Sequence, residues 1–356
     1  MSMGMPKIEI VFTTAANNTI RRGQTGTVAL IVKDAVASGY MELTSAAQVP
    51  ETLTADNQAY VARVFTGYIT APRKVLLYVL ESDAEDLTEA LDALAAKEFD
   101  YLAGPPEIGA AEAKAVVAWV KQRREDYHAI CKAVLPNEAA NSDAVINFAA
   151  NGIMVGEKSY TAAQYCSRIA GMLAGTPLTY SLTYATLPEV QRVESMTQSE
   201  MDEAVDAGKL ILYYNGRTVK AGRAVNSLQT LGPNQTEAYK KIKVVALLDL
   251  IESDLRSAYE ESYVGRYSNS YDNKIVLLTA TKDYFSRLEA DGVLQPDSTV
   301  EIDYDAQKQW LEEHGVDTGN MTEDEILKAN TGSQVFLRAS IGVLDAIEDI
   351  RLEITL

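Results

Sequence analysis

The sequence predicts a mixed α/β fold, with an α/β layer in the N-terminal half, a mixed sheet and long helices in the C-terminal half, and extended strand arms at both ends. Residues 27–32 and 74–80 are nearly continuous apolar runs, which are typical of strands covered on both faces of a sheet. Segments with helical spacing of apolar residues follow, so strands and helices alternate. Residues 350–356 alternate apolar and polar side chains, which indicates a strand with one buried face.

The composition is that of a folded chain with room for about two domains. The 356 residues are 47% hydrophobic and 23% charged, which lies within the range of globular proteins and outside that of disordered chains. We predict an N-terminal strand arm, an α/β domain, a core domain and a C-terminal strand arm, spanning residues 1–20, 21–150, 151–343 and 344–356.

The N-terminal half begins with a short predicted strand on a polar tether. Ile8, Ile10 and Phe12 alternate with other residues, and an aperiodic stretch rich in Thr, Ala and Asn follows them. Pro136 ends the last strand of this half. The predicted elements are strands 27–32 and 74–80, helices 83–96 and 109–124, and strand 127–134.

The second half combines hairpins with long helices. Asn215 and Gly216 supply the positive φ angles of a tight hairpin turn. Thr322 and Glu325 form a capping box, which marks the start of a short helix. The other predicted elements are a hairpin of residues 209–214 and 217–221, helices 236–259, 273–290 and 305–314, and strands 300–302 and 334–343.

The formal net charge of −18 disfavours nucleic-acid binding, because a polyanion would be repelled over most of the surface. The same charge opposes casual self-association, so a polymer of this chain needs specific contacts. Basic clusters are usually solvated faces, but between acidic subunits they are the natural sites of intersubunit ion pairs. The clusters comprise Arg21, Arg22, Arg123, Arg124, Lys240, Lys241 and Lys243.

The chain has two cysteines, Cys131 and Cys166, and its first residues lack the basic and apolar regions of a signal peptide. We therefore expect synthesis in a reducing cytoplasm. No apolar run approaches the roughly 20 residues that cross a bilayer, so membrane insertion is not expected.

Residues that could carry catalysis are few. Of the two histidines, His128 lies three residues before Cys131 in a predicted strand, where such positions face opposite sides. We interpret it as a core or rim residue and not as half of a Cys-His pair. His314 precedes Gly315 at a predicted helix end, where a capping role is favoured. No catalytic residue is predicted.

Glu301, Asp303 and Asp305 would place three carboxylates on one side of a strand, and such a cluster can hold Mg²⁺ or Ca²⁺. The simpler interpretation has Asp303 or Asp305 capping the next helix while Glu301 faces solvent. No phosphate-binding glycine loop follows a predicted strand. We predict no metal and no cofactor; the alternative is an enzyme on a doubly wound α/β sheet, for example a metal-dependent hydrolase.

Residues 161–175 form a predicted helix that is unusually rich in alanine and glycine. Small side chains let another backbone approach closely. Tight packing in the core is the simpler interpretation, and an assembly surface is the alternative if the helix is exposed.

Eight segments from about residue 150 onward share their order with a known family. They are NGI (151–153), AGMLAGTPL (170–178), SLTY (181–184), VNSL (225–228), YFSRL (284–288), VEID (300–303), GSQVFL (332–337) and LDAIEDI (344–350). Together they resemble the contractile phage tail sheath protein family. The chain is short for that family and resembles the minimal sheaths of R-type bacteriocins and defective-phage particles.

The resemblance implies a structural subunit that polymerises in helical rings around an inner tube, in a metastable extended state, and contracts to drive the tube through a target cell envelope. Its implied partners are other copies of itself, the inner tail tube protein, and baseplate and tail terminator proteins. It further implies that the chain is made in a bacterial cytoplasm and released on lysis within a phage tail or bacteriocin particle. The implied intersubunit strand arms carry Ile8, Ile10, Phe12, Ile350, Leu352, Ile354 and Leu356.

Overall fold

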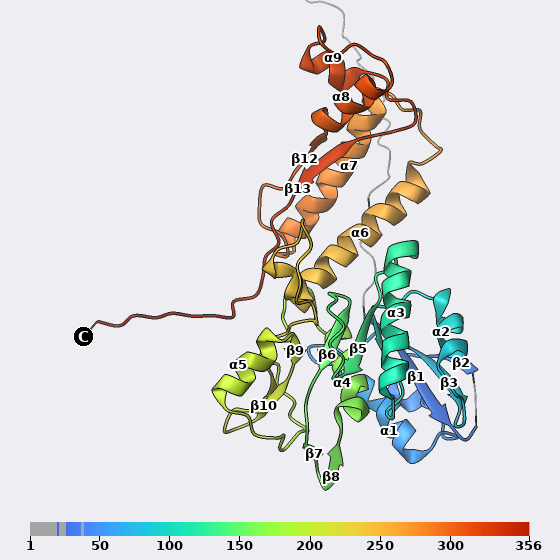
Figure 1. Ribbon diagram of the computed structural model, residues 1–356, viewed down its shortest axis with the longest axis vertical. Helices are drawn as coiled ribbons and strands as arrows, with labels where there is room; N and C mark the ends of the chain where they lie inside the picture. The colour runs from blue at the N-terminus through green and yellow to red at the C-terminus, as the bar shows by residue number, and fades with distance from the viewer. Residues whose placement is uncertain (1–19, 21–25, 37–38, 356) are drawn as a thin grey trace, which may run out of the picture. The chain divides into compact units, whose positions relative to one another are not determined.

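A computed structural model describes residue 20, residues 26–36 and residues 39–355 (Figure 1). These residues form two compact units. Unit 1 comprises residue 20 and residues 254–342, and unit 2 comprises the described residues of 26–253 together with 343–355. The predicted N-terminal strand with Ile8, Ile10 and Phe12 lies outside the described residues, and so do Arg21, Arg22 and Leu356. The four-part division of the chain stays a prediction.

Unit 2 is built on a seven-stranded sheet with the order β2-β3-β1-β4-β5-β6-β9. Neighbouring strands pair in parallel except β2, which is antiparallel to β3. The predicted α/β layer is therefore confirmed. The strands are β1 (Thr27–Asp34), β2 (Gly39–Leu43), β3 (Lys74–Glu81), β4 (Tyr101–Ala103), β5 (Lys132–Pro136), β6 (Val145–Phe148) and β9 (Lys209–Leu210).

Helices cover both faces of this sheet. On one face, the β1 side chains Val28 and Leu30 share a core with α1 and α4, while on the other face Ala29 and Ile31 share a core with α2 and α3. Burial on both faces explains the nearly continuous apolar runs of β1 and β3. The helices are α1 (Ala55–Val64), α2 (Thr88–Ala95), α3 (Ala110–Tyr127), α4 (Ala162–Ala174) and α5 (Gln198–Asp206), with a 3-10 turn η1 (Ala46–Gln48).

The small residues of α4 lie in the core of unit 2. A Cβ atom on Gly171 would lie 2.1 Å from the carbonyl oxygen of Val64 in α1, closer than real Cβ atoms approach. Ile169, Ala170 and Met172 beside it are fully buried. Close packing in the core is thus confirmed for this helix, and the alternative of an exposed assembly surface is wrong.

Unit 2 also carries two small antiparallel hairpins, β7 (Ile153–Val155) with β8 (Lys158–Tyr160) and β10 (Leu212–Tyr214) with β11 (Val219–Ala221). The second hairpin was predicted, but its turn is wider than a two-residue turn. Strand β10 ends at Tyr214 and β11 begins at Val219, so four residues lie between them. The side-chain oxygen of Asn215 accepts the backbone N–H groups of Arg217 and Thr218 within this loop. Within the Asn-Gly pair, Gly216 has a positive φ of 91° and Asn215 does not.

Unit 1 combines long helices with a two-stranded sheet. Helix α6 (Ile242–Ser262) starts in unit 2 and ends in unit 1, after the 3-10 turn η2 (Glu237–Lys240). The Thr322 capping box and the predicted helices and strands of this region are confirmed, with shifted ends. The other elements are α7 (Tyr271–Ala290), β12 (Thr299–Ile302), α8 (Tyr304–Glu313), α9 (Glu323–Lys328) and β13 (Leu337–Ser340), with β12 and β13 antiparallel.

The predicted strand over residues 127–134 is wrong in its first half. Helix α3 continues to Tyr127, and His128 caps it in the left-handed conformation with φ 53°, its N–H bonded to the Arg123 carbonyl oxygen. Strand β5 starts only at Lys132. The single left-handed residue ends the helix, and it has no signature in the apolar pattern of the sequence.

Candidate assembly surfaces

The C-terminal residues 350–355, here called the C-terminal arm, are extended and lie exposed. Ile350, Leu352 and Ile354 are 83%, 77% and 76% exposed, and no strand of the described chain pairs with them. Between them, the Arg351 guanidinium contacts the Glu353 carboxylate, so the charged residues share one side. An arm with three aligned apolar side chains and unpaired backbone groups has the character of an edge strand that lacks its sheet.

The two-stranded sheet of unit 1 offers an open edge. In its ladder, the Asp303 N–H donates to the Phe336 carbonyl oxygen at 3.0 Å, which makes 303 and 336 a hydrogen-bonded pair. Because such pairs alternate along an antiparallel ladder, the backbone groups of Leu337 and Ala339 point away from β12. No other strand in the described part of the chain pairs with this edge of β13.

A groove of about 870 Å³ adjoins this edge within unit 1. Its walls are mostly apolar and come from the C-terminal part of α6, from α7 and from one face of the sheet. Two buried polar atoms in the groove, the Tyr263 hydroxyl and the Asn269 side-chain oxygen, have no hydrogen-bond partner among the described residues. Lining residues include Leu277, Phe285, Val300, Val335, Leu337 and Ala339.

This groove was not predicted, although the sequence contains a signal for it. Tyr259, Tyr263 and Tyr267 recur every fourth residue and their rings form a ladder, with centroids 6.3 and 5.7 Å apart. Such a stripe at helical spacing is usually core. In the structure only Tyr259 lies within α6, and the three rings differ in burial: Tyr263 is buried, whereas Tyr267 is 42% exposed.

The described basic clusters are engaged within the chain. Arg124 forms two hydrogen bonds with Asp249, at 2.6 and 3.0 Å. Arg123 donates to backbone carbonyl oxygens, and Lys240 pairs with Glu237 at 2.9 Å. Lys241 pairs with Asp345 and Glu348, while Lys243 is buried, which lowers its pKa. The prediction that any of these residues bridges subunits stays a prediction.

The histidines and cysteines form no catalytic pair in the structure. His128 is an exposed helix cap 3.4 Å from Glu252, whereas Cys131 is buried, and burial raises the pKa of its thiol. A core position for His128 is therefore wrong, because the residue lies exposed at the end of α3. His314 caps α8 as predicted, with Nδ1 2.7 Å from the Trp310 carbonyl oxygen.

The three acidic residues at the start of α8 are also accounted for. Asp303 caps the helix by accepting the Ala306 N–H at 3.1 Å, and Glu301 faces solvent, as the simpler interpretation predicts. Arg338 of β13 lies 2.8 Å from Asp303 and 3.1 Å from Asp305. The guanidinium thus neutralises the carboxylates that a metal ion would need.

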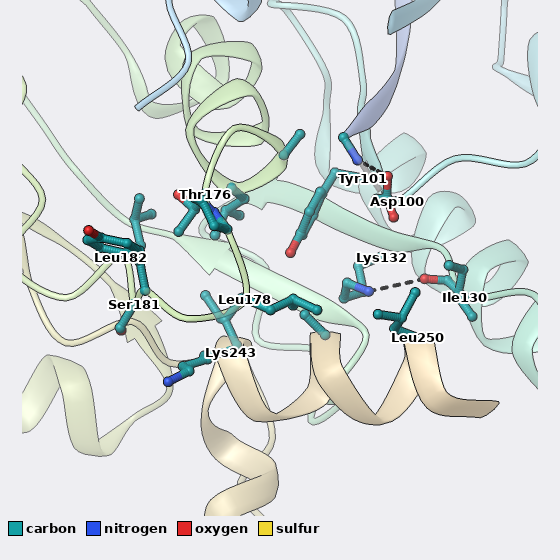
Figure 2. Close-up of a pocket in the computed structure, with 17 residues that line it drawn as sticks. Asp100, Tyr101, Ile130, Lys132, Thr176, Leu178, Ser181, Leu182, Lys243 and Leu250 are labelled. Carbon is teal, nitrogen blue, oxygen red and sulfur yellow. Dashed lines mark hydrogen bonds between the residues drawn. The ribbon is translucent and has the colours of Figure 1, made fainter. Parts of the chain in front are cut away.

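A cavity of about 50 Å³ lies under α6 in unit 2 (Figure 2). Asp100 accepts the N–H groups of Gly26 and Thr27 at 2.7 and 2.8 Å, and Lys132 donates to the Ile130 carbonyl oxygen at 3.1 Å. Burial raises the pKa of Asp100, and Lys132 partly opposes that effect. Sheets of this kind bind ligands at the carboxyl ends of their strands, in sites of about 300 Å³ or more. This cavity lies at the amino ends of β1, β4 and β5 and is far smaller.

Within the two units as described, no helix is both long enough and apolar enough to cross a membrane.

Comparison with known proteins places the chain in one family. Residues 81–227 match the phage tail sheath protein central domain, and residues 234–356 match the phage tail sheath C-terminal domain. A tail sheath protein of the Clostridium phage phiCD119 is 37% identical over 358 residues, and the match covers 99% of each chain. The phage-like element PBSX protein XkdK of Bacillus subtilis is 24% identical over 61% of this chain and 49% of its own length.

The fold matches solved sheath structures at low sequence identity. The anti-feeding prophage helical sheath in the contracted state superposes with a TM-score of 0.71 at 16% identity, covering 99% of each chain. A sheath tail protein from Desulfitobacterium hafniense superposes with a TM-score of 0.68 at 17% identity, covering 83% of this chain and 94% of that one. Because the family matches span most of the sequence and one relative aligns along its whole length, the chain belongs to the phage tail sheath protein family.

Proposed function

We propose that this sheath subunit polymerises in helical rings around an inner tail tube, is held in a metastable extended state, and contracts to drive the tube through a target cell envelope. Its partners in this proposal are other copies of the chain, the tube protein, and baseplate and terminator proteins of a phage tail or bacteriocin particle. The observation that carries the proposal is that one chain has both an exposed apolar arm and an open sheet edge.

The joint between copies is strand addition, in which the C-terminal arm of one copy pairs with the β13 edge of another. Ile350, Leu352 and Ile354 would then cover apolar walls of the groove. Each main-chain hydrogen bond nets about 1 kcal/mol, and each fully buried apolar side chain about 1.5–3 kcal/mol. Several such contacts per arm make a joint that holds while other interfaces exchange.

The proposal requires no bound cofactor and makes the chain structural rather than enzymatic. Contraction needs two packings of one body, with the more stable packing blocked kinetically until a partner releases it. The free energy of repacking then drives the motion. The phage phiCD119 relative and the two superposed structures are sheath proteins, which agrees with this role.

Electron microscopy of the purified full-length chain, alone and with its tube protein, tests the proposal across a series of salt concentrations. We expect hollow striated cylinders. Leu352→Asp places a charge on the apolar side of the arm and should abolish them, whereas Thr355→Asp adds the same charge on the other side and should not. Globular particles under every salt condition would overturn the proposed function.

A further inference from the structure

The segment just before the C-terminal arm is held by a carboxylate-binding site in unit 2. The side chain of Glu348 is only 5% exposed. Its Oε1 accepts the Thr183 hydroxyl at 2.6 Å, and its Oε2 lies 3.0 Å from Lys241 Nζ and 3.7 Å from Arg223 Nε. Arg223 also pairs with Asp349 at 2.6 Å. We call this set of contacts the Glu348 clasp.

The hydroxyl proton of Thr183 has a fixed direction in the clasp. The Ala224 N–H donates to Thr183 Oγ1 at 2.9 Å, which leaves the hydroxyl proton for Glu348. Ser181 Oγ lies 3.0 Å from the same hydroxyl and 3.5 Å from Glu348. A donor oriented in advance binds a carboxylate without paying to reorganise, which distinguishes the clasp from a chance surface pair.

The backbone beside Thr183 is strained, and the strain serves the clasp. Tyr184 has a φ of 60°, a conformation that bulky residues rarely adopt. Its N–H donates to the Ala221 carbonyl oxygen at 3.2 Å, and its ring packs edge-on against Tyr213 at 5.9 Å. These contacts hold the turn from which Thr183 reaches Glu348.

The carboxylates of the clasp stabilise the charged forms of Lys241 and Arg223. Burial by itself lowers the pKa of Lys241, but hydrogen bonds to Asp345 and Glu348 outweigh burial and raise it. The pKa of Arg223 rises in the same way, with burial opposed by Asp349 and Glu348. Lys243 lies two residues after Lys241, and the charges of Asp345 and Glu348 likewise favour its charged form, although burial outweighs them and lowers its pKa.

Glu348 is a buried side chain in an otherwise exposed segment. Its side chain is 5% exposed, whereas Ile347 before it and Ile350 after it are 87% and 83% exposed. We propose that the Glu348 clasp is a positioning site that fixes the root of the C-terminal arm, so that the arm is presented to a neighbouring copy in advance of docking. This inference rests on the proposed function. A fixed root reduces the conformational entropy that the arm loses when it docks, which strengthens polymerisation without any added contact.

The first test observes the clasp in the unassembled full-length chain. A nitroxide label on Ile347→Cys, which is 87% exposed, reports the root, and one on Ile354→Cys reports the free arm. The native Cys131 and Cys166 are buried and should not react. We expect a slower label at 347 than at 354, and Glu348→Gln or Thr183→Val should make the two equally mobile. Equal mobility in the unmutated background would overturn the clasp.

The second test measures the critical concentration for polymerisation by light scattering. Glu348→Gln should raise it by about tenfold, while Glu353→Gln, which removes the same charge from an exposed residue of the arm, should not. Thr183→Val should raise it with no change of charge. A critical concentration unchanged by Glu348→Gln would overturn the positioning role. If the unmutated chain forms no polymer, the proposed function is overturned, and the positioning role of the clasp is overturned with it. The mobility of the two labels still decides whether the clasp itself exists.

Discussion

Two buried residues of unit 2, Asp249 and Gly171, make contacts whose loss should lower the free energy of unfolding. Asp249 on α6 accepts from Lys132 of β5 at 2.6 Å and from Arg124 of α3 at 2.6 and 3.0 Å. Burial would raise the pKa of Asp249, but the two cations outweigh burial and hold the pKa below its ordinary value. Gly171 on α4 has a different role, because it gives the Val64 carbonyl oxygen the space of a missing side chain.

Asp249→Asn should lower the free energy of unfolding at neutral pH by about 3–5 kcal/mol, because buried Lys132 and half-buried Arg124 lose their charged partner. An acid whose pKa is depressed by folding stabilises the fold above its unfolded pKa of about 4, and that stability is lost as pH falls through the folded pKa. The difference between the variant and the unmutated chain should therefore shrink below about pH 4. Urea unfolding at several pH values measures it, with Asp83→Asn on the surface as control. A difference that stays constant down to the lowest pH would contradict the assignment.

Gly171→Ala should destabilise the chain by about 1–3 kcal/mol or more, because overpacking displaces backbone that cannot yield. Gly109→Ala is the matched control, since nothing lies within 4 Å of a Cβ there and its φ is negative. Thermal unfolding compares the two. Equal melting temperatures would mean that α1 and α4 can move apart at no cost.

At the scale of elements, apolar patterns located the long buried strands β1 and β3 and the long helices, because these segments are long enough for their burial to show in the sequence. The short buried strands β4 and β6 were missed, because three or four apolar residues form no distinctive pattern. Helix ends and turns were located less well. The left-handed cap at His128 and the four-residue loop after Tyr214 depend on the backbone conformation of single residues, which the apolar pattern does not record. The groove beside β13 joins segments distant in sequence, so no local pattern could predict its volume or the unpaired Tyr263 hydroxyl. The clasp likewise joins Thr183 to Glu348 across 165 positions of sequence.

The open edge of β13 gives a prediction at the same scale. Ala339→Pro removes the N–H that points away from β12 and leaves the ladder between β12 and β13 intact, because edge positions of this kind tolerate proline. The variant should fold normally by circular dichroism and form no cylinders by electron microscopy. Ala339→Val keeps the N–H and should still assemble. Normal cylinders from the proline variant would exclude this edge as the acceptor.

For the whole molecule, the dominant property is a net charge of −18 on each copy. Raising the salt concentration from about 0.1 M to about 1 M shortens the Debye length from about 10 Å to about 3 Å. Repulsion between copies is screened, whereas main-chain hydrogen bonds and apolar contacts of the joint are hardly affected. The critical concentration for polymerisation should therefore fall with salt, as measured by light scattering. A rise would mean that ion pairs between copies dominate the interface.

The acceptor strand and the arm lie close together in the sequence. Strand β13 ends at Ser340 and the arm begins at Ile350, so nine residues, 341–349, lie between them. In the proposed joint, these nine residues connect the edge that accepts one neighbour's arm to the arm that binds the next neighbour. A pull along a row of linked copies would travel through this short stretch and bypass the seven-stranded sheet. In an assembled sheath, tensile force would therefore pass from copy to copy through the C-terminal segments. The rest of each subunit could change its orientation without being stretched.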